Sequence, residues 1–183
     1  DQLDLAAANV EAGDKGVAVN AYLQSTSNPK IYAAGDAADT QGAPLTPVAV
    51  FEGKVAASNM LKGNRTKPDY SGVPSAVFTV PELTRVGMLE QDAREAGHDI
   101  RVVENDTSDW YSNLRVGESC AATKVIIDKD SDTILGAHLL GPEYGEIINF
   151  FGLAIRLGLT TSDLKKMVSV YPSVGSDLGS MLS

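Results

Sequence analysis

The residues best suited to chemistry follow a short apolar run at residues 31–34 (IYAA), which ends at Gly35-Asp36. A carboxylate just past the C-terminal end of a buried strand lies where open α/β sheets bind ligands. Ionised Asp36 would accept hydrogen bonds from sugar-like hydroxyls or backbone N–H groups, and Gly35 lets another group approach the backbone closely. The alternative is that Asp36 is the N-cap of a short helical turn (AADTQ), which needs no ligand.

A helix is predicted shortly after this stretch, over residues 46–62, with Gly63 as its C-terminal stop. Its first turn, near Thr46, presents unpaired N–H groups and the positive end of the helix dipole, which stabilise negative charge on a nearby ring. Its apolar and small side chains form two stripes: Val48, Phe51 and Val55, and then Ala49, Gly53, Ala56 and Met60. Because glycine costs about 1 kcal/mol inside a helix, close packing or a ligand is expected at Gly53.

The part of the chain that holds these residues has two short strand candidates, residues 16–20 and 31–34. The second is continuous enough to be a strand buried on both faces. This part is too short to bury its own strands as a doubly wound sheet, so it is expected to need partners outside this sequence. Residues 63–74, rich in Gly, Pro and polar residues, are predicted to be a linker.

The rest of the chain has the pattern of an α+β domain, in which strands precede a cluster of helices. Strands are predicted at residues 75–80, 84–88, 100–105, 122–128 and 133–141, and helices at 90–96, 143–159, 160–167 and 173–182. The helix at 160–167 is expected to be capped at Thr160, with Asp163 at its N3 position. The sequence DKDSD at residues 128–132 imitates a calcium loop, but Thr133 stands where such a loop needs glycine. A hairpin turn is therefore predicted there, and no metal site is predicted in the chain.

Charge and composition exclude several classes of partner. The 183-residue chain has a formal net charge of −9, so no basic surface is expected for nucleic acid or for anionic membranes. No apolar run approaches the roughly 20 residues that span a bilayer, and the N-terminus has no basic segment typical of a signal peptide. The single cysteine, Cys120, fits a reducing compartment and a cytoplasmic protein, and it is expected to be buried or half-buried.

Several segments carry a resemblance to a known family. Residues 26–36, 45–49 and 52–54 (TSNPKIYAAGD, LTPVA and EGK) resemble the second flavin-binding segment of the pyridine nucleotide-disulfide oxidoreductases. That family includes glutathione reductase, dihydrolipoamide dehydrogenase and mercuric reductase. The later segments VFTVPEL, ILGAHLLG and EII, at residues 77–83, 134–141 and 146–148, are similar to the dimerisation domain of the same family. The resemblance covers essentially the whole chain.

The resemblance implies a fold and a cofactor. It implies an α+β chain in which a glutathione-reductase-type dimerisation domain, an antiparallel sheet with helices at residues 71–183, follows an incomplete α/β FAD-binding segment at residues 1–70. Asp36 would bind the ribityl hydroxyls of FAD, and the start of the helix would face the pyrimidine side of the isoalloxazine ring. The cofactor-binding residues expected from it are Gly35, Asp36, Leu45, Thr46, Pro47, Val48 and Ala49.

The resemblance also implies partners. The chain would form a homodimer through the helix at residues 143–159 and the C-terminal helices, because the apolar face of that helix is wider than one core contact requires. Its stripes are Ile147, Phe150, Ala154 and Leu157, and beside them Ile148, Phe151 and Ile155. The first flavin segment, a Cys-x4-Cys redox pair and the NAD(P)H domain lie upstream in such proteins. The chain is therefore expected to be a C-terminal fragment of a longer oxidoreductase and to be inactive alone.

One departure from the family concerns the C-terminal segment. Disulfide-reducing members carry His-Pro-Thr, with a Glu five residues after the His, whereas this chain has Tyr171 at the His position and Ser176 at the Glu position, followed by Asp177. A phenol is a poor general base at pH 7, but it can donate a hydrogen bond or stack on a ring. Tyr171 and Asp177 are thus the candidate catalytic residues. The alternatives are that Tyr171 fills the interface, and that the chain is a stand-alone dimerisation module without redox activity.

Overall fold

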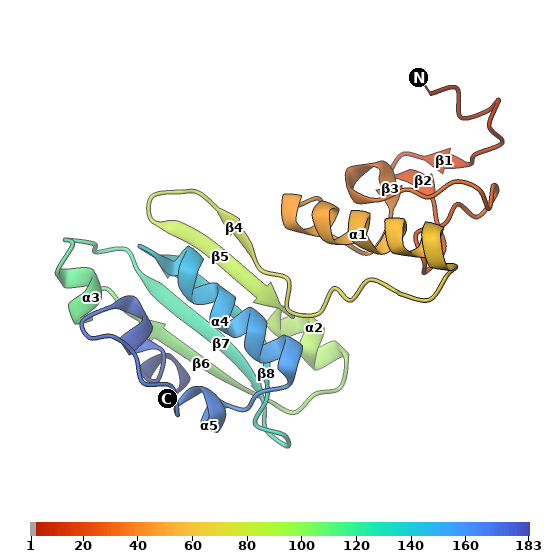
Figure 1. Ribbon diagram of the computed structural model, residues 1–183. Coiled ribbons are helices and arrows are strands. Elements are labelled where there is room, and N and C mark those ends of the chain that lie inside the picture. Colours follow the sequence, from red (N-terminus) through yellow and green to blue (C-terminus); the bar gives the residue numbers. More distant parts are fainter. Residues whose placement is uncertain (1–2) are drawn as a thin grey trace. The chain divides into compact units, whose positions relative to one another are not determined.

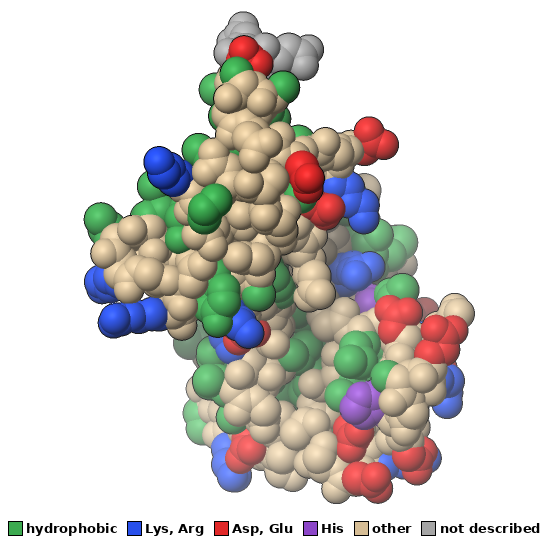
Figure 2. Space-filling view, turned by 90° about the vertical axis from the view of Figure 1, so that its right-hand side faces the viewer, with side chains coloured by type: hydrophobic (Ala, Val, Ile, Leu, Met, Phe, Trp, Pro, Cys, Tyr) green, Lys and Arg blue, Asp and Glu red, His purple; other side chains and the backbone are tan. Residues whose placement is uncertain are grey.

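The computed structural model describes residues 3–183, and packing contacts divide the chain into two compact units, residues 1–70 and residues 71–183. Figure 1 shows the elements of each unit. The helices of the described part include none that is long and apolar enough to cross a membrane. Figure 2 shows both acidic and basic side chains on the face in view, with many of the Asp and Glu side chains near its lower right-hand edge.

The first unit consists of one long helix packed against short strands and loops. Helix α1 runs from Thr46 to Lys62 and stops at Gly63, whose φ is 77°, so the predicted helix and its stop are confirmed. Three strands form a small sheet in the order β1-β2-β3, with β1 and β2 antiparallel and β2 and β3 parallel. Their bounds are Ala12–Gly13 (β1), Gly16–Ala18 (β2) and Ala38–Asp39 (β3), and a 3-10 turn, η1, covers Gly35–Ala37.

The expected buried strand at residues 31–34 is wrong. These residues are extended and half-buried, but they pair only through a single antiparallel bridge between Tyr32 and Gln24. The neighbouring bonds run from the Ala33 N–H to the Leu23 carbonyl at 3.0 Å and from the Ser25 N–H to the carbonyl of residue 31 at 2.9 Å. A strand buried on both faces needs two neighbouring strands and two covering layers. The described part of the first unit supplies one short extended neighbour.

The buried face of α1 differs from both predicted stripes, because it includes two polar side chains. Its buried residues are Val48, Glu52, Val55, Ala56 and Asn59, which lie on one helical face. The Asn59 amide donates to the carbonyls of Tyr22 at 2.9 Å and Thr66 at 2.8 Å, and its oxygen accepts from the Arg65 and Thr66 N–H groups. The end of α1 is thereby tied to two loops.

Close packing at Gly53, one of the two alternatives expected there, is not found within the described chain, and the approach of a ligand stays a prediction. A Cβ atom built on Gly53 meets no described atom within 4 Å. Gly53 lies beside the buried face of α1 and not on it, so no neighbour within the described chain requires a glycine there.

The second unit is built on a five-stranded antiparallel sheet in the order β4-β5-β8-β7-β6. The strands are β4 (Ser75–Val77), β5 (Glu82–Gly87), β6 (Ile100–Asp106), β7 (Ala122–Asp128) and β8 (Ile134–Gly141). The predicted hairpin between β7 and β8 is confirmed, and its register shifts at a bulge between Ile126 and Ile127. Short helices α2 (Glu90–Glu95) and α3 (Tyr111–Leu114) lie in the connections, of which only α2 was predicted.

Helix α4, from Tyr144 to Leu157, lies along the sheet over β5 and β8 (Figure 1) and forms the main core of this unit with it. Phe151 and Tyr144 are fully buried in that core, together with residues of β7, β8 and the C-terminal turns. The expectation that Phe151 faces a partner subunit is therefore wrong. The exposed apolar side chains of α4 are Phe150 (38%), Leu153 (52%) and Leu157 (60%).

The C-terminal segment forms short turns instead of the helix predicted at residues 173–182. Its 3-10 turns are η2 (Val174–Asp177) and η3 (Ser180–Leu182). Two glycines four residues apart, Gly175 and Gly179, disfavour a continuous helix, while Met181 and Leu182 anchor the turns in the core. The preceding helix α5 (Thr161–Leu164) begins with the capping box formed by Thr160 and Asp163, as predicted.

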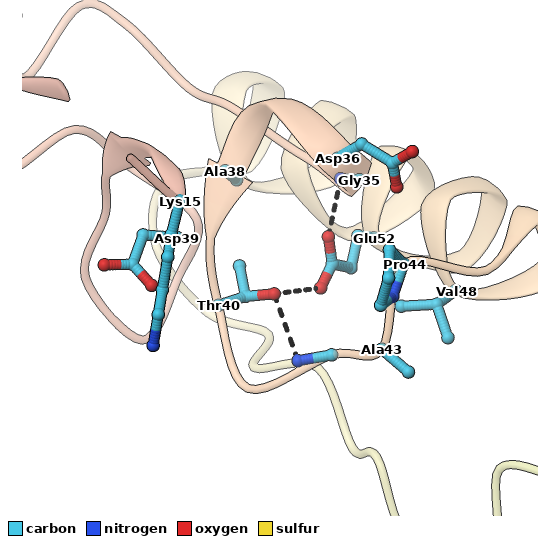
Figure 3. Close-up of a pocket in the computed structure, with 11 residues that line it drawn as sticks. Lys15, Gly35, Asp36, Ala38, Asp39, Thr40, Ala43, Pro44, Val48 and Glu52 are labelled. Atoms are coloured by element: carbon cyan, nitrogen blue, oxygen red, sulfur yellow. Dashed lines mark hydrogen bonds between the residues drawn. The ribbon is translucent and has the colours of Figure 1, made fainter. Parts of the chain in front are cut away.

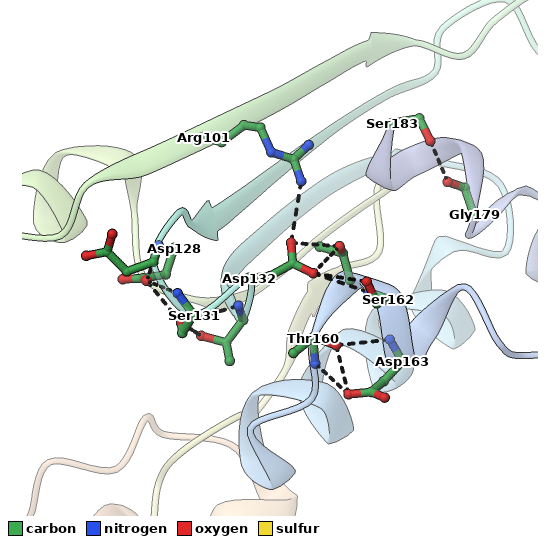
Figure 4. Close-up of polar contacts among 12 residues, drawn as sticks. Arg101, Asp128, Ser131, Asp132, Thr160, Ser162, Asp163, Gly179 and Ser183 are labelled. Atoms are coloured by element: carbon green, nitrogen blue, oxygen red, sulfur yellow. Dashed lines mark hydrogen bonds and ion pairs between the residues drawn. The ribbon is translucent and has the colours of Figure 1, made fainter.

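Asp132 joins the β7–β8 hairpin to α5 (Figure 4). Its carboxylate accepts from the Thr161 hydroxyl at 2.7 and 2.8 Å and from the Ser162 N–H at 3.4 Å, with Arg101 at 3.7 Å. Those bonds, the Thr161 hydroxyl first, lower the pKa of Asp132. The joint fixes the point at which the C-terminal segment leaves the sheet.

We expect Gly53→Ala to raise the free energy of unfolding of the 183-residue chain by about 0.5–1 kcal/mol, because alanine favours the helix and its methyl group meets no neighbour. Gly35→Ala is the matched control. At a φ of +62° and with Ala49 Cβ 2.8 Å from the new Cβ atom, it should lower that free energy by about 1–3 kcal/mol. Urea unfolding measures both. A destabilising Gly53→Ala would show that this helix face is packed.

We also expect the second unit to lose stability in acid. Backbone and side-chain bonds from Ser131, with His98 beside them, lower the pKa of Asp128 to about 2, and Lys166 with Thr160 does the same for Asp163. The pKa of an Asp in the unfolded chain is about 4. Both carboxylates therefore stabilise the fold above pH ~4, and their contribution is lost as the pH falls toward 2.

Asp128→Asn tests this pH dependence, since an amide oxygen can still accept the turn N–H bonds that Oδ1 of Asp128 accepts. The slope of unfolding free energy against pH between about 4 and 2 should be shallower in the variant than in the wild type. Identical slopes in urea titrations would contradict the prediction.

Candidate functional site

The loop that carries Asp36 packs against the first turn of α1. Gly35 has a φ of +62°, and a Cβ atom there would lie 2.8 Å from Cβ of Ala49. Glycine is therefore needed both for the left-handed backbone and for the close approach of the helix. A group was expected to approach the backbone of Gly35 closely, and within the described chain that group is Ala49 of α1.

The Asp36 side chain is exposed and accepts no hydrogen bond from any residue that the structure describes. The alternative that it caps a helical turn is wrong, because the residue before η1 is Ala34 and the following residues enter β3. The N-terminus of α1 is likewise uncapped: Leu45 precedes it without a side-chain bond, Pro47 lies in its first turn, and that turn has no acidic residue. A free carboxylate and free N–H groups thus belong to the same small region.

A hollow of about 320 Å³ opens beside this region (Figure 3). Its walls include Lys15, Asp36, Asp39, Pro44, Val48 and Glu52. In Figure 3 the carboxylate of Asp36 points away from that of Glu52, which faces Thr40. The hollow is large enough for part of a dinucleotide cofactor and too small for all of it.

Glu52 is the residue of this region that sequence reasoning missed. It is fully buried, and its Oε2 accepts from the Gly35 N–H at 2.6 Å. Its Oε1 accepts from the Tyr70 hydroxyl at 2.6 Å and from the Thr40 hydroxyl at 2.9 Å. Burial, together with the bond to Glu52, raises the pKa of Tyr70 to about 12. The phenol therefore stays protonated and donates a hydrogen bond to Glu52. A signal was present, because Glu52 interrupts the apolar face between Val48 and Val55.

The seven predicted cofactor-binding residues lie together in the first unit. Gly35, Asp36 and Val48 line the hollow, and Ala49 packs on Gly35. The remaining three, at positions 45, 46 and 47, form the start of α1. Whether they bind a cofactor stays a prediction.

The two candidate catalytic residues lie in the second unit. Tyr171 is 74% exposed and stacks on Tyr111, with ring centroids 6.4 Å apart and an interplanar angle of 18°. Asp177 accepts a hydrogen bond from the buried Ser112. Helix α3 therefore holds the C-terminal segment at two places, and within residues 3–183 no hydrogen bond joins Tyr171 to Asp177.

Two further predictions can be compared with the structure. Cys120 is exposed, so its expected burial is wrong; it lies in the loop after α3, where its N–H donates to Glu118. Among the described residues, no cluster of three or more His, Cys, Asp or Glu side chains could hold a metal ion.

The comparisons with known proteins identify the class. The family described as pyridine nucleotide-disulphide oxidoreductase, dimerisation domain, matches residues 73–181. The chain belongs to the pyridine nucleotide-disulphide oxidoreductase family, and its second unit has the fold of that family's dimerisation domain. The resemblance read from the sequence and the α+β fold class are confirmed.

Relatives include both enzymes and a short protein. The chain is 35% identical over 179 residues to mercuric reductase from Staphylococcus aureus, which covers 97% of this chain and 32% of that enzyme. It is 51% identical over 180 residues to a 19.7 kDa protein in the mercuric resistance operon of Staphylococcus aureus, covering 98% of this chain and 100% of that protein. The structure of the HOCl-induced flavoprotein disulfide reductase RclA from Escherichia coli matches with a TM-score of 0.86 at 28% identity, covering 100% of this chain and 42% of RclA.

Proposed function

We propose that this chain supplies flavin contacts and the homodimer interface of an FAD-dependent, NAD(P)H-linked oxidoreductase. The observation that carries the proposal is the free carboxylate of Asp36 beside the uncapped N-terminus of α1, in a loop that Gly35 and Glu52 hold in place. The chain spans about a third of the length of the related enzymes, so further flavin contacts and the NAD(P)H site would come from segments like those upstream in the family.

The residues present fit one part of FAD. An exposed carboxylate without a partner accepts hydroxyl hydrogen bonds of the kind a ribityl chain offers. The free N–H groups of the first turn of α1, of which Pro47 contributes none, would stabilise negative charge on the electronegative side of the ring system. Bound FAD would supply the redox chemistry, and this chain would orient it. The hollow is too small for the remainder of the cofactor, which agrees with weak binding by this chain alone.

Tyr171 would serve the acceptor side of such an enzyme. Its exposed hydroxyl can donate a hydrogen bond, and its stacking on Tyr111 limits its mobility. Asp177, whose carboxylate is bonded to Ser112, would hold the segment and not move protons itself.

The homodimer would form through the exposed stripe of α4, defined as Phe150, Leu153 and Leu157. These side chains are spaced three and four residues apart, so they lie on one helical face that the protomer's own core leaves uncovered. The C-terminal segment adds exposed apolar residues, among them Val168 and Val170. An apolar surface of this kind is typical of obligate interfaces.

A second candidate function is a stand-alone dimerisation or interaction module without redox chemistry. It is favoured by the 19.7 kDa relative, whose whole length matches this chain. The two candidates differ in flavin binding, and both require self-association.

We expect the natural protein that carries this chain to bind FAD, and Asp36→Ala to weaken that binding by about tenfold or more, because a charged hydrogen-bond acceptor is removed. Asp39→Ala is the matched control, since Asp39 is an exposed carboxylate on the wall of the same hollow. Flavin absorbance of the purified protein and titration of its apoprotein with FAD give the readout. A protein that never retains FAD would remove the enzyme proposal and leave the module, whereas equal affinities in wild type and Asp36→Ala would remove the proposed role of Asp36.

For the interface, we expect Phe150→Asp to give folded monomers, because a buried unpaired charge opposes association. Phe151→Asp should instead unfold the second unit, since that ring is buried in the protomer's own core. Sedimentation velocity and circular dichroism separate the two effects. An undisturbed dimer with Phe150→Asp would show that another surface forms the interface.

A further inference from the structure

We propose that Glu52 is a positioning residue of the flavin site, whose buried carboxylate fixes the Gly35–Asp36 loop on α1. This inference rests on the proposed function, because a positioned Asp36 matters only if a ligand contacts it. The geometry around Glu52 does not depend on the proposed function, so the first of the two experiments below needs no flavin.

The first step concerns what the Glu52 carboxylate can bind. Its two oxygens face three donors: the Gly35 N–H, the Tyr70 hydroxyl and the Thr40 hydroxyl. The Thr40 hydroxyl donates to Glu52, because a carboxylate only accepts, and its oxygen in turn accepts the Gly42 N–H at 3.1 Å. A carboxylate accepts at both oxygens, whereas an amide would turn its NH₂ group toward at least one donor. The three bonds as they stand therefore need Glu, and Gln would break or reverse at least one of them.

The second step concerns which part of the molecule these bonds hold. Gly35 directly precedes Asp36, and η1, the turn that contains both, has no buried residue of its own. The bond from the Gly35 N–H to Glu52 therefore adds a polar attachment to the packing of Gly35 on Ala49. With the loop attached, the Asp36 carboxylate points away from Glu52 (Figure 3) and is left free for a ligand.

The third step separates positioning from general support of the fold. Asn59 is a second buried polar residue on the same face of α1, and it bonds Tyr22, Arg65 and Thr66 without touching the Asp36 loop. Loss of Asn59 bonds should therefore destabilise the unit and leave the site intact. Asn59→Asp is the matched control for Glu52→Gln, because each exchanges an amide and a carboxylate of equal size in a buried network.

The first experiment measures hydrogen exchange of backbone amides in the 183-residue chain without flavin. We expect the Gly35 amide to exchange about tenfold faster in Glu52→Gln than in the wild type, and to keep wild-type protection in Asn59→Asp. If Glu52→Gln does not fold, Glu52→Asp, which is one methylene shorter and keeps the charge, carries the same comparison. An unchanged Gly35 amide, or equal acceleration in the Glu52 and Asn59 variants, would overturn the inference.

The second experiment measures FAD affinity in the natural protein that carries this chain. We expect Glu52→Gln to weaken FAD binding by about tenfold, the Asn59→Asp control to leave it unchanged, and Glu52→Gln added to Asp36→Ala to cause little further loss, because both act through one carboxylate. If Asp36→Ala weakens binding and Glu52→Gln does not, this inference fails while the proposed function stands. If Asp36→Ala has no effect, the proposed role of Asp36 in FAD binding fails, and this positioning role fails with it; if no variant and no wild type binds FAD, the proposed function fails.

Discussion

The first unit depends on the burial of a carboxylate and an amide along the inner face of α1. Its apolar core is small, with Leu23, Val55 and Ala56 as the buried cluster, and its strands are two or three residues long. Buried backbone groups must still find partners. Glu52 and Asn59 supply them from the helix, and in doing so they fix loops that a larger sheet would otherwise hold. The geometry around Asp36 follows from these side-chain bonds more than from apolar packing.

In the second unit, a sheet provides the hydrogen-bond partners of the buried backbone groups. Five paired strands satisfy their own backbone, and α4 covers them with a continuous core that includes Phe151 and Tyr144. Neighbouring residues on a helix point about 100° apart, so Phe150 and Phe151 serve different surfaces. Phe151 is buried in the protomer's own core, and Phe150 belongs to the exposed stripe of α4. The wide apolar face of α4 is thus two faces side by side, an inner one and an outer one.

Much of this architecture could be predicted from the sequence, and the failures have physical causes. The limits of α1, the β7–β8 hairpin and the Thr160 capping box depend on local signals, so they were predicted correctly. The strand at residues 31–34 failed because its hydrophobicity gives no information about whether neighbouring strands are present. Phe151 was misplaced because periodicity does not show which apolar face meets which neighbour. Cys120 was misplaced because the frequent burial of cysteine says nothing about one that lies in an exposed loop. Glu52 was missed because a glutamate in a helix is expected to face solvent. Its three hydrogen-bond donors are distant in sequence, so only the structure shows that they surround it.

The cost of the Glu52 network distinguishes the two candidate functions on physical grounds. Replacing a buried ionic group with apolar side chains of similar volume is often neutral or stabilising, so a carboxylate held by three donors is not the simplest way to stabilise a small unit. Gly35 adds a backbone position that other residues adopt only with strain. A dimerisation module needs neither feature, because its interface and its core lie in the second unit. Both features are accounted for if the Gly35–Asp36 loop must hold the Asp36 carboxylate in a fixed place for a bound ligand.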